Sequence, residues 1–174
     1  MVKRGLFVGR FQPFHLGHLG AIKDILGEVD ELVIVIGSAQ YSHSVDDPFT
    51  AGERLVMVRN ALEEAGIDFR RVWVVPVPDI NLHMMWVSAI EGYTPEFDVV
   101  YSNEPLTRRL FIEAGYKVKS IPFHKRKVYS STGIRKKMLN GESWEELVPK
   151  SVIEFIKEID GVNRLRDLTK GDEV

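Results

Sequence analysis

The sequence predicts an α/β fold, in which a doubly wound parallel sheet of five strands carries helices on both faces and is followed by a helical C-terminal segment. Three observations lead to this prediction. Up to residue 129, five short apolar runs alternate with longer amphipathic stretches. The middle runs are too continuously apolar for a sheet with one face in water. Beyond residue 129 the hydrophobic pattern is helical.

The five strand candidates are short runs rich in β-branched and aromatic residues. They span residues 4–9, 31–37, 71–78, 97–102 and 116–122. The amphipathic stretches between them span residues 17–28, 50–65, about 83–92 and 104–114. Each strand–helix–strand unit is expected to cross over in the right-handed sense, which gives a Rossmann-like sheet buried on both faces.

Capping residues mark several of the expected helix ends. In "TAGE", Thr50 can cap the second helix while Glu53 reaches back to the cap amide. Gly66 follows the last turn of that helix, where a left-handed residue is common. Asn103, two residues before Pro105, predicts the start of the fourth helix.

The part of the chain after residue 129 is expected to form three helical segments. They cover residues 131–139, 143–147 and 149–159, the last beginning at Pro149. The tail from Asn163 is polar, and we expect it to be frayed. Because no repeat or linker divides the chain, we expect one domain over 1–174. It consists of an α/β core at 1–129 and a helical C-terminal part at 130–170.

Composition excludes several classes of function. The 174 residues are 44% hydrophobic and 28% charged, as in an ordinary globular domain, and the formal net charge of −2 gives no general attraction to nucleic acid or anionic membrane. Without cysteine there is no disulfide, thiolate zinc site or cysteine nucleophile. No apolar segment reaches the roughly 18 residues that span a bilayer. We therefore expect a soluble, cytoplasmic protein with no nucleic-acid or membrane partner.

The stretch "GRFQPFHLGH", residues 9–18, directly follows the first strand candidate. In a doubly wound sheet this strand end usually borders the ligand crevice. Gly9 lets the backbone turn sharply near a ligand, and Gly17 and His18 open a helix whose free amides attract anions. Because His15 and His18 are three residues apart, they can project to the same side of the first turn.

A metal site, a structural role and a phosphate site are the three interpretations of this stretch. A metal site needs a third ligand, commonly a carboxylate, and residues 9–18 contain none. Two histidines satisfied at a helix start would be the ordinary structural explanation. Arg10, His15, His18 and a helix start all favour negative charge in one place, so we favour phosphate. The glycine spacing matches neither the dinucleotide fingerprint nor the P-loop.

The stretch "YSSTGIRKKM" at 129–138 is a second candidate for phosphate binding. Ser130, Ser131 and Thr132 offer hydroxyls and amides at a helix start, and Arg135 lies one turn further on. A capping sequence with an exposed arginine explains the same residues equally well. Other basic side chains nearby indicate a solvated face, or a strip that binds RNA. They are Lys125, Arg126, Lys127, Lys136 and Lys137.

Taken together, these motifs resemble a known family. "HLGH" after "GRFQPF" is similar to the H-x-G-H signature of the nucleotidylyltransferase superfamily, and the whole string resembles archaeal nicotinamide mononucleotide adenylyltransferases. The resemblance covers nearly the full chain. It continues through "IGSAQYSH" at 36–43, "DPFTAGER" at 47–54, "WVSAIEGYTPEFDVVYSNEPL" at 86–106, "STGIRKKMLNGE" at 131–142 and "GVNRLRDL" at 161–168.

The resemblance implies a reaction and a set of site residues. AMP passes from ATP to nicotinamide mononucleotide by in-line attack without a covalent enzyme intermediate, giving NAD and pyrophosphate. The implied catalytic residues are Arg10, His15, His18 and Arg135. The implied ATP-binding residues are Gly9, Arg10, Phe11, His15, Gly17, His18, Ser130, Ser131, Thr132 and Arg135. The implied nicotinamide-nucleotide-binding residues are Ser38, Asp79, Ile80 and Trp86, although Trp86 also fits a core position.

The resemblance further implies Mg²⁺ carried mainly by the substrate phosphates, with no metal-ligating side chain in the protein, and a homo-oligomer, often a hexamer. Two positions depart from close relatives: His83 replaces an asparagine, and Asp46 replaces an arginine for which His43 is a weak substitute. Three alternatives stay open. The acceptor could be nicotinic acid mononucleotide, pantetheine phosphate or FMN, the chain could sense nucleotides without turnover, or it could bind RNA.

Overall fold

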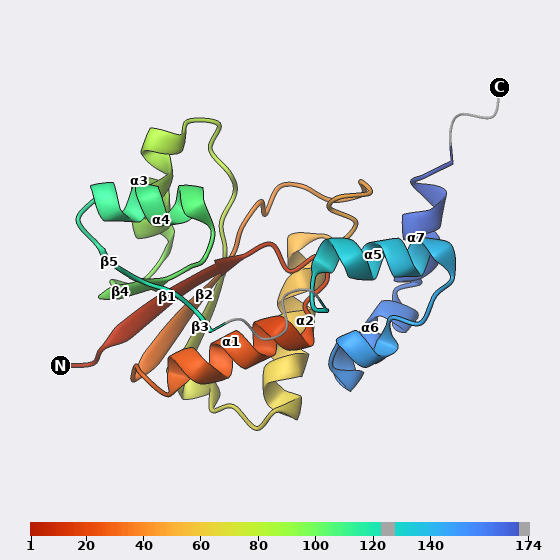
Figure 1. The fold of residues 1–174 in the computed structure, drawn as a ribbon, viewed down its shortest axis with the longest axis horizontal. Coiled ribbons are helices and arrows are strands. Elements are labelled where there is room, and N and C mark those ends of the chain that lie inside the picture. Colours follow the sequence, from red (N-terminus) through yellow and green to blue (C-terminus); the bar gives the residue numbers. More distant parts are fainter. Residues whose placement is uncertain (123–127, 171–174) are drawn as a thin grey trace. The chain divides into compact units, whose positions relative to one another are not determined.

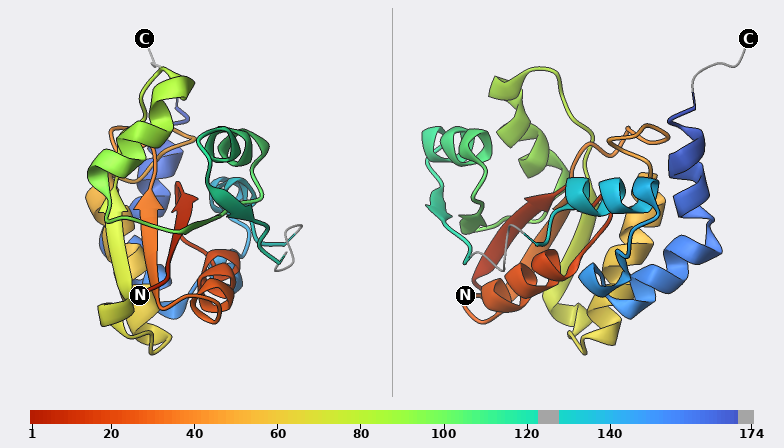
Figure 2. Two further views of the ribbon diagram at one scale, coloured as in Figure 1. Left: turned by 90° about the vertical axis from the view of Figure 1, so that its left-hand side faces the viewer. Right: turned by 45° about the vertical axis from the view of Figure 1, so that its right-hand side comes forward.

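The computed structural model describes residues 1–122 and 128–170, and it has the predicted doubly wound architecture. Five parallel strands form one sheet in the order β3-β2-β1-β4-β5 (Figure 1). Their bounds are Arg4–Gly9 for β1, Glu31–Ile36 for β2, Val72–Pro76 for β3, Val99–Tyr101 for β4 and Lys117–Lys119 for β5. Strands β1 and β2 run side by side with their arrowheads in the same direction (Figure 2). The chain order reverses at β1, which is the switch point where such sheets bind ligands.

The described residues group into two compact units. Unit 1 comprises 1–10, 20–39 and 68–122, and unit 2 comprises 11–19, 40–67 and 128–170. The first turn of helix α1 (Leu16–Leu26) therefore belongs to unit 2 and the rest of it to unit 1. The expectation of a single domain over 1–174 stays a prediction.

Unit 1 contains the sheet and the helices that cover its two faces. Helices α3 (His83–Tyr93) and α4 (Pro105–Glu113) bury their apolar side chains against one face. That core consists of Leu6, Val33, Val35, Val77, Val87, Ile90, Phe97, Val100 and Phe111. On the opposite face Gly5 leaves room for Ile25 of α1 and the Tyr101 ring. Neighbouring strand residues thus point to opposite faces, and both faces are covered, as the continuous apolar runs predicted.

Unit 2 is helical apart from its loops. It contains α2 (Ala51–Glu64), α5 (Ser131–Asn140), α6 (Lys150–Glu158) and α7 (Gly161–Asp167), with a 3₁₀ turn at Glu145–Leu147. Helix α2 packs against α6, and α5 packs against α7. In the described part of the chain, none of the helices combines the length and apolar character that a bilayer crossing requires.

The predicted caps of α2 are confirmed. The Thr50 hydroxyl accepts the Glu53 amide at 3.1 Å, the Glu53 carboxylate accepts the Thr50 amide at 2.9 Å, and Gly66 has φ 69°. The start predicted at Asn103 is wrong by one residue, because Glu104 caps α4. The Asn103 side chain is instead occupied by both backbone groups of Ile121, at 2.8 and 3.0 Å.

The frayed tail predicted from Asn163 is also wrong, since α7 runs on to Asp167. Leu165 is fully buried, and Arg164 forms a two-pronged ion pair with Glu53 of α2 at 2.7 and 2.8 Å. Most residues of this segment are polar, but Leu165 is a buried apolar residue and Arg164 is held in an ion pair. Tertiary contacts of that kind order a short helix that its own propensity would not.

Candidate functional site

The turn after β1 is made by Phe11 and not, as expected, by Gly9. Gly9 is the last residue of β1, where it pairs with Ile36 and accepts the Gly37 amide at 2.9 Å. Phe11 has φ 54°, in the left-handed region that few side chains adopt. Its buried ring packs against Phe14 with 5.6 Å between centroids, and this packing holds the turn in place.

Gln12 connects this turn to two other segments of unit 2. Its side-chain amide donates to the Phe49 carbonyl at 2.9 Å and accepts the Phe49 amide at 3.0 Å, with both residues buried. Its main-chain carbonyl accepts a hydrogen bond from Arg135 Nη1 at 2.8 Å. One glutamine therefore ties the turn to the residue before α2 and to helix α5.

The two histidines of the H-x-G-H stretch lie face to face at the start of α1. Their ring centroids are 3.5 Å apart with 17° between the planes, so they do project to the same side, as predicted. The amide of His15 donates to Nδ1 of His18 at 3.2 Å, and the amide of His18 donates to Nδ1 of His15 at 3.3 Å. Each Nδ1 is thus an acceptor, which leaves the proton of each neutral ring on Nε2.

Burial keeps both imidazoles neutral. It lowers the pKa of His15 to about 4. It also lowers the pKa of His18 well below the usual 6.5, and the nearby His15 lowers it further. The expectation that the pair favours negative charge therefore does not require charged rings at neutral pH. The pair offers two oriented, uncharged Nε2–H donors instead.

The same hydrogen bonds disfavour a metal at the histidine pair. A histidine that ligates a metal through Nε2 must carry its proton on Nδ1, and both Nδ1 atoms here face amide hydrogens. Across residues 1–122 and 128–170, no group of three His, Asp or Glu side chains could hold a metal ion. The donor chemistry at the turn suits an anion better than a cation.

Gly17 makes the stacked arrangement possible. A Cβ added there would lie 2.9 Å from the Cβ of Tyr129 and 3.0 Å from two ring atoms of His15. Side chains do not tolerate such contacts, so a larger residue would displace one of the two rings. The glycine of the H-x-G-H stretch is therefore required for packing.

The start of α5 approaches the same turn. Ser130 caps the helix by accepting the Gly133 amide at 3.0 Å, and the Ser131 hydroxyl donates to the Pro13 carbonyl at 2.9 Å. Arg135, one turn on, is only 5% exposed. The alternative of a simple cap followed by an exposed arginine is therefore wrong for this motif. Thr132 remains exposed at the free N-terminal end of the helix.

Other basic residues near α5 fall into two groups. Lys136 is exposed, and Lys137 lies 3.6 Å from the Glu142 carboxylate, as expected of a solvated face. Lys125, Arg126 and Lys127 lie outside the described residues, so the RNA-strip interpretation is not tested.

Gly9 and Arg10 belong to unit 1, and their membership of the phosphate site stays a prediction.

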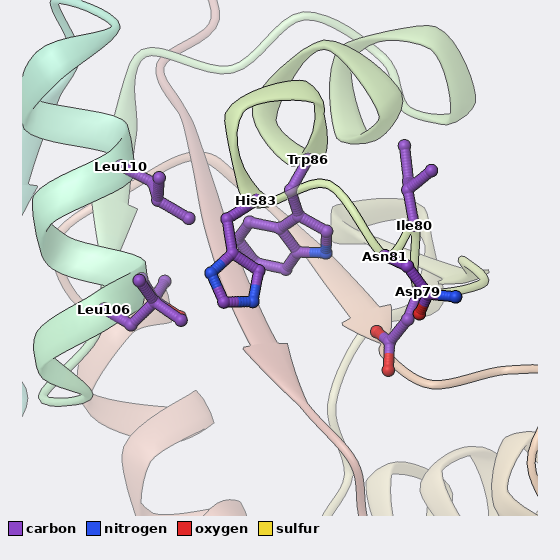
Figure 3. Close-up of a pocket in the computed structure, with 8 residues that line it drawn as sticks. Asp79, Ile80, Asn81, His83, Trp86, Leu106 and Leu110 are labelled. Carbon is purple, nitrogen blue, oxygen red and sulfur yellow. The ribbon is translucent and has the colours of Figure 1, made fainter.

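Unit 1 has a separate cavity of about 330 Å³ between α3 and α4, close to the end of β3. Its wall includes the predicted residues Asp79, Ile80 and Trp86 (Figure 3). The indole of Trp86 and the imidazole of His83 stand at one side, and two leucines of α4 stand opposite (Figure 3). The lining thus combines aromatic and apolar side chains with the carboxylate of Asp79, a mixture typical of small-molecule sites.

Trp86 serves the core and the cavity at once. It is half-buried and meets Phe111 edge to face with 5.6 Å between centroids. Ser38, predicted on the same subsite, donates its hydroxyl to Asp79 at 2.6 Å and adopts φ 50°. The carboxylate of Asp79 is thereby fixed at the cavity edge.

The match to protein families agrees with this geometry. The model of the cytidylyltransferase-like family matches residues 6–137. The nicotinamide-nucleotide adenylyltransferase of Methanosarcina barkeri is 56% identical over 169 residues, which cover 97% of this chain and 96% of the relative. That of Methanolobus tindarius is 53% identical over 172 residues, covering 99% and 98%. The chain belongs to the nicotinamide-nucleotide adenylyltransferase family.

A solved structure supports the fold of this family member. The bifunctional NMN adenylyltransferase/ADP ribose pyrophosphatase from Francisella tularensis, complexed with AMP and Mn ion, superposes with a TM-score of 0.79 at 24% identity. The match covers 97% of this chain and 52% of that chain, so this chain spans about half of the bifunctional protein. At this identity the likeness shows the shared α/β fold.

Sequence reasoning missed several residues at the two sites. Gln12 was not singled out, and no local signal in the sequence marks its role, because its partners are 37 and 123 residues away. The leucines Leu106 and Leu110 of α4 line the cavity of unit 1. Their i, i+4 spacing was a visible signal of one shared helix face. His83, left open by its departure from the family pattern, also lines this cavity.

Proposed function

We propose that this chain is a nicotinamide-nucleotide adenylyltransferase that joins the AMP part of ATP to nicotinamide mononucleotide, giving NAD and pyrophosphate. The observation that carries the proposal is the stacked pair of His15 and His18 at a turn whose Gln12 carbonyl also binds the buried Arg135. This arrangement occurs in a chain more than half identical to named enzymes of that activity.

The chemistry needs no nucleophile from the protein. An oxygen of the 5′-phosphate of nicotinamide mononucleotide forms a bond to the α-phosphorus of ATP, and the bond from that phosphorus to the bridging oxygen breaks. Pyrophosphate leaves with the electron pair. The enzyme therefore has to align two polyanions and stabilise the charge that develops on the phosphoryl oxygens.

The residues of unit 2 suit those two tasks. We assign His18 to the α-phosphate and His15, with Arg10, to the phosphates around the reacting centre. Neutral donors fixed in advance stabilise developing charge without reorganising during the reaction. Arg135 is assigned to the β- and γ-phosphates that leave, because a guanidinium remains charged at every working pH. Its anchor on the Gln12 carbonyl, at 2.8 Å, fixes where that charge is presented.

The remaining ATP contacts are assigned to backbone and hydroxyl groups. Backbone amides and hydroxyl groups at the start of α5 suit the phosphates, since a helix N-terminus attracts anions. These residues are Ser130, Ser131 and Thr132. Phe11 and Gly17 are assigned to shaping the turn that the nucleotide approaches, and Gly9 is kept among the residues proposed to bind ATP.

The cavity of unit 1 is assigned to the nicotinamide nucleotide. Trp86 offers an indole face for stacking on the pyridine ring, which is electron-poor. Asp79, Ile80 and Ser38 are assigned to the polar edge of the same nucleotide. The volume of about 330 Å³ suits one ring and part of its ribose.

A divalent cation is proposed as the cofactor, with Mg²⁺ as the natural choice. The Francisella protein was solved with Mn ion and AMP, which supports divalent metal use in adenylyl transfer on this fold. The donor set around the histidines of this chain does not fit a protein-held cation, because both Nδ1 atoms accept amides. We therefore propose that the cation arrives on the phosphates and keeps mostly water ligands. We further propose that the protein is a cytoplasmic homo-oligomer, with the hexamer that its resemblance to archaeal relatives implies.

A panel of acceptors tests the function. The protein is mixed with ATP, Mg²⁺ and nicotinamide mononucleotide, nicotinic acid mononucleotide, pantetheine phosphate or FMN, and pyrophosphate release is followed with the dinucleotide identified by mass. We expect NAD formation with nicotinamide mononucleotide and none without an acceptor. Release that favours pantetheine phosphate or FMN would reassign the acceptor, and no release with any acceptor would refute the enzyme. Radiolabelled AMP retained on the protein would refute the direct transfer.

A further inference from the structure

Arg135 has a second partner that the proposed reaction does not use. Its Nη2 lies 3.5 Å from Oδ1 of Asp46, which belongs to the loop before α2 in the same unit. The two side chains differ sharply in exposure: that of Arg135 is 5% exposed and that of Asp46 is 82% exposed. The guanidinium is held inside the protein while the carboxylate reaches it from solvent.

The two contacts of Arg135 differ in strength as well. Its Nη1 donates to the Gln12 carbonyl at 2.8 Å, a normal distance inside the buried turn. The 3.5 Å separation from Asp46 exceeds the 2.7–2.9 Å typical of a strong charged hydrogen bond. An ion pair with one partner in water is also weak. Arg135 is thus anchored by Gln12, and its contact with Asp46 is easily exchanged.

The backbone on either side of Asp46 is fixed, so the carboxylate is presented at a defined place. Ser44 and Asp47 exchange hydrogen bonds, with the Asp47 amide donating to the Ser44 hydroxyl at 3.0 Å and the Ser44 amide donating to the Asp47 carbonyl at 3.2 Å. Phe49, two residues further on, is clamped by Gln12. The side chain of Asp46 extends from this fixed backbone and is 82% exposed, so it can leave Arg135 without rearrangement of the loop.

We propose that Asp46 is a placeholder anion: it occupies Arg135 while the phosphate site is empty and competes there with the polyphosphate of ATP and with the pyrophosphate product. The inference rests on the proposed function, because it needs Arg135 to receive the leaving phosphates. Asp46 then acts against ATP binding and in favour of product release. It is a residue that tunes affinity through Arg135, not a group that touches the reacting atoms.

The two effects follow from charge alone. A carboxylate beside the guanidinium must be displaced, and it repels a polyanion that arrives at the same spot. Pyrophosphate carries its charge at the same place as the β- and γ-phosphates, so the carboxylate of Asp46 repels it in the same way. Removing the charge of Asp46 should therefore tighten ATP and pyrophosphate together and leave the nicotinamide nucleotide unaffected.

Steady-state kinetics of Asp46→Asn test this with Glu154→Gln as the matched control. Glu154 is an exposed acid, 67% accessible, and its carboxylate lies 3.8 Å from Lys150 on the same helix. Both variants thus lose one exposed, weakly paired negative charge. For Asp46→Asn we expect KM for ATP and the inhibition constant of pyrophosphate to fall by about two- to fivefold, the range of an exposed charge contact. The KM for nicotinamide mononucleotide should match that of the control.

Salt supplies an independent readout. Because the repulsion between Asp46 and the phosphates of ATP acts between exposed charges, the difference in KM for ATP between wild type and Asp46→Asn should shrink at high ionic strength. The charge reversal Asp46→Lys should lower KM for ATP further than Asp46→Asn does. Asp46→Ser serves as a second neutral variant if the asparagine disturbs the loop, with far-ultraviolet circular dichroism confirming the fold of each.

The outcomes separate the inference from the function on which it rests. A KM for ATP that is unchanged relative to Glu154→Gln would overturn the placeholder role. A raised KM would overturn it too, since Asp46 would then be holding Arg135 in its productive position. Absence of turnover in the wild type with every acceptor would instead refute the proposed function.

Discussion

Replacing His18 separately by asparagine and by glutamine tests whether an uncharged Nε2–H donor is what the site contributes. The amide of asparagine can place its oxygen where Nδ1 accepts the His15 amide at 3.2 Å. The longer glutamine can place its NH₂ near the position of Nε2. Each variant therefore keeps one half of the function of the ring.

The expected size of the effect follows from how firmly the ring is held. His18 contacts Phe11 at 4.8 Å, Phe14 at 5.4 Å and His15 at 3.5 Å between centroids, so its donor is oriented before substrate arrives. Loss of one preorganised donor costs about 10²–10³-fold in kcat, or about 2.7–4 kcal/mol. We expect a loss of that size for His18→Asn, and a smaller loss, about tenfold, for His18→Gln.

The assay is steady-state pyrophosphate release with saturating ATP and nicotinamide mononucleotide, with urea unfolding of each variant as the control for stability. Both variants lose the same ring packing, so their unfolding free energies should be similar. Near-normal kcat in His18→Asn would remove His18 from the catalytic residues. A kcat of His18→Gln at or below that of His18→Asn would show that Nδ1, and not Nε2, carries the contribution.

Three further predictions follow from the two sites. Trp86→Ala should raise KM for nicotinamide mononucleotide far more than KM for ATP, and Trp86→Phe should restore most of the affinity for the nicotinamide nucleotide. Equal changes in both KM values would show that Trp86 only packs in the core. Gly17→Ala should destabilise the fold by about 1–3 kcal/mol in urea unfolding, because its Cβ would meet Tyr129 and His15, whereas the control Gly92→Ala, with nothing within 4 Å, should be neutral or stabilising. Lowering the pH from 6.5 toward 4 should reduce the free energy of unfolding of the wild type by about 3 kcal/mol through His15, because the unfolded chain binds the proton first and the pKa of folded His15 is about 4. This contribution to stability is complete above pH 6.5. A His15→Gln variant that loses as much free energy of unfolding over this pH range would contradict the assignment.

The parallel sheet and the helices on its two faces could be predicted from the sequence because the signals are local and repeated. Continuous apolar runs such as "ELVIVI" at 31–36 mark buried strands, and alternation with helices leaves few topologies. Helix caps were predicted where both partners lie within one turn, as for Thr50 and Glu53. The prediction failed at Asn103, whose side chain bonds to Ile121, eighteen residues away.

The candidate site could be predicted as a set of residues but not as a set of contacts. The H-x-G-H stretch and Arg135 stand out because basic groups at helix starts are a local pattern. The burial of Arg135 depends on Gln12, which is 123 positions away, and no local pattern reports such a distance. For the same reason Asp46 could be noticed as a departure from relatives, while its approach to Arg135 could not be foreseen.

The neutral histidines change how the work of the site is divided. The sequence alone indicates one cluster of basic side chains, made of Arg10, His15, His18 and Arg135. Burial and the crossed amide bonds to Nδ1 instead make the two histidines uncharged donors with a defined direction. In the proposed mechanism, charge neutralisation falls to the arginines and to the cation on the phosphates, while the histidines supply geometry at the reacting phosphorus. Such a site would hold the α-phosphate in line with uncharged donors and leave the binding of pyrophosphate mainly to Arg135, whose affinity for that product the carboxylate of Asp46 is proposed to lower.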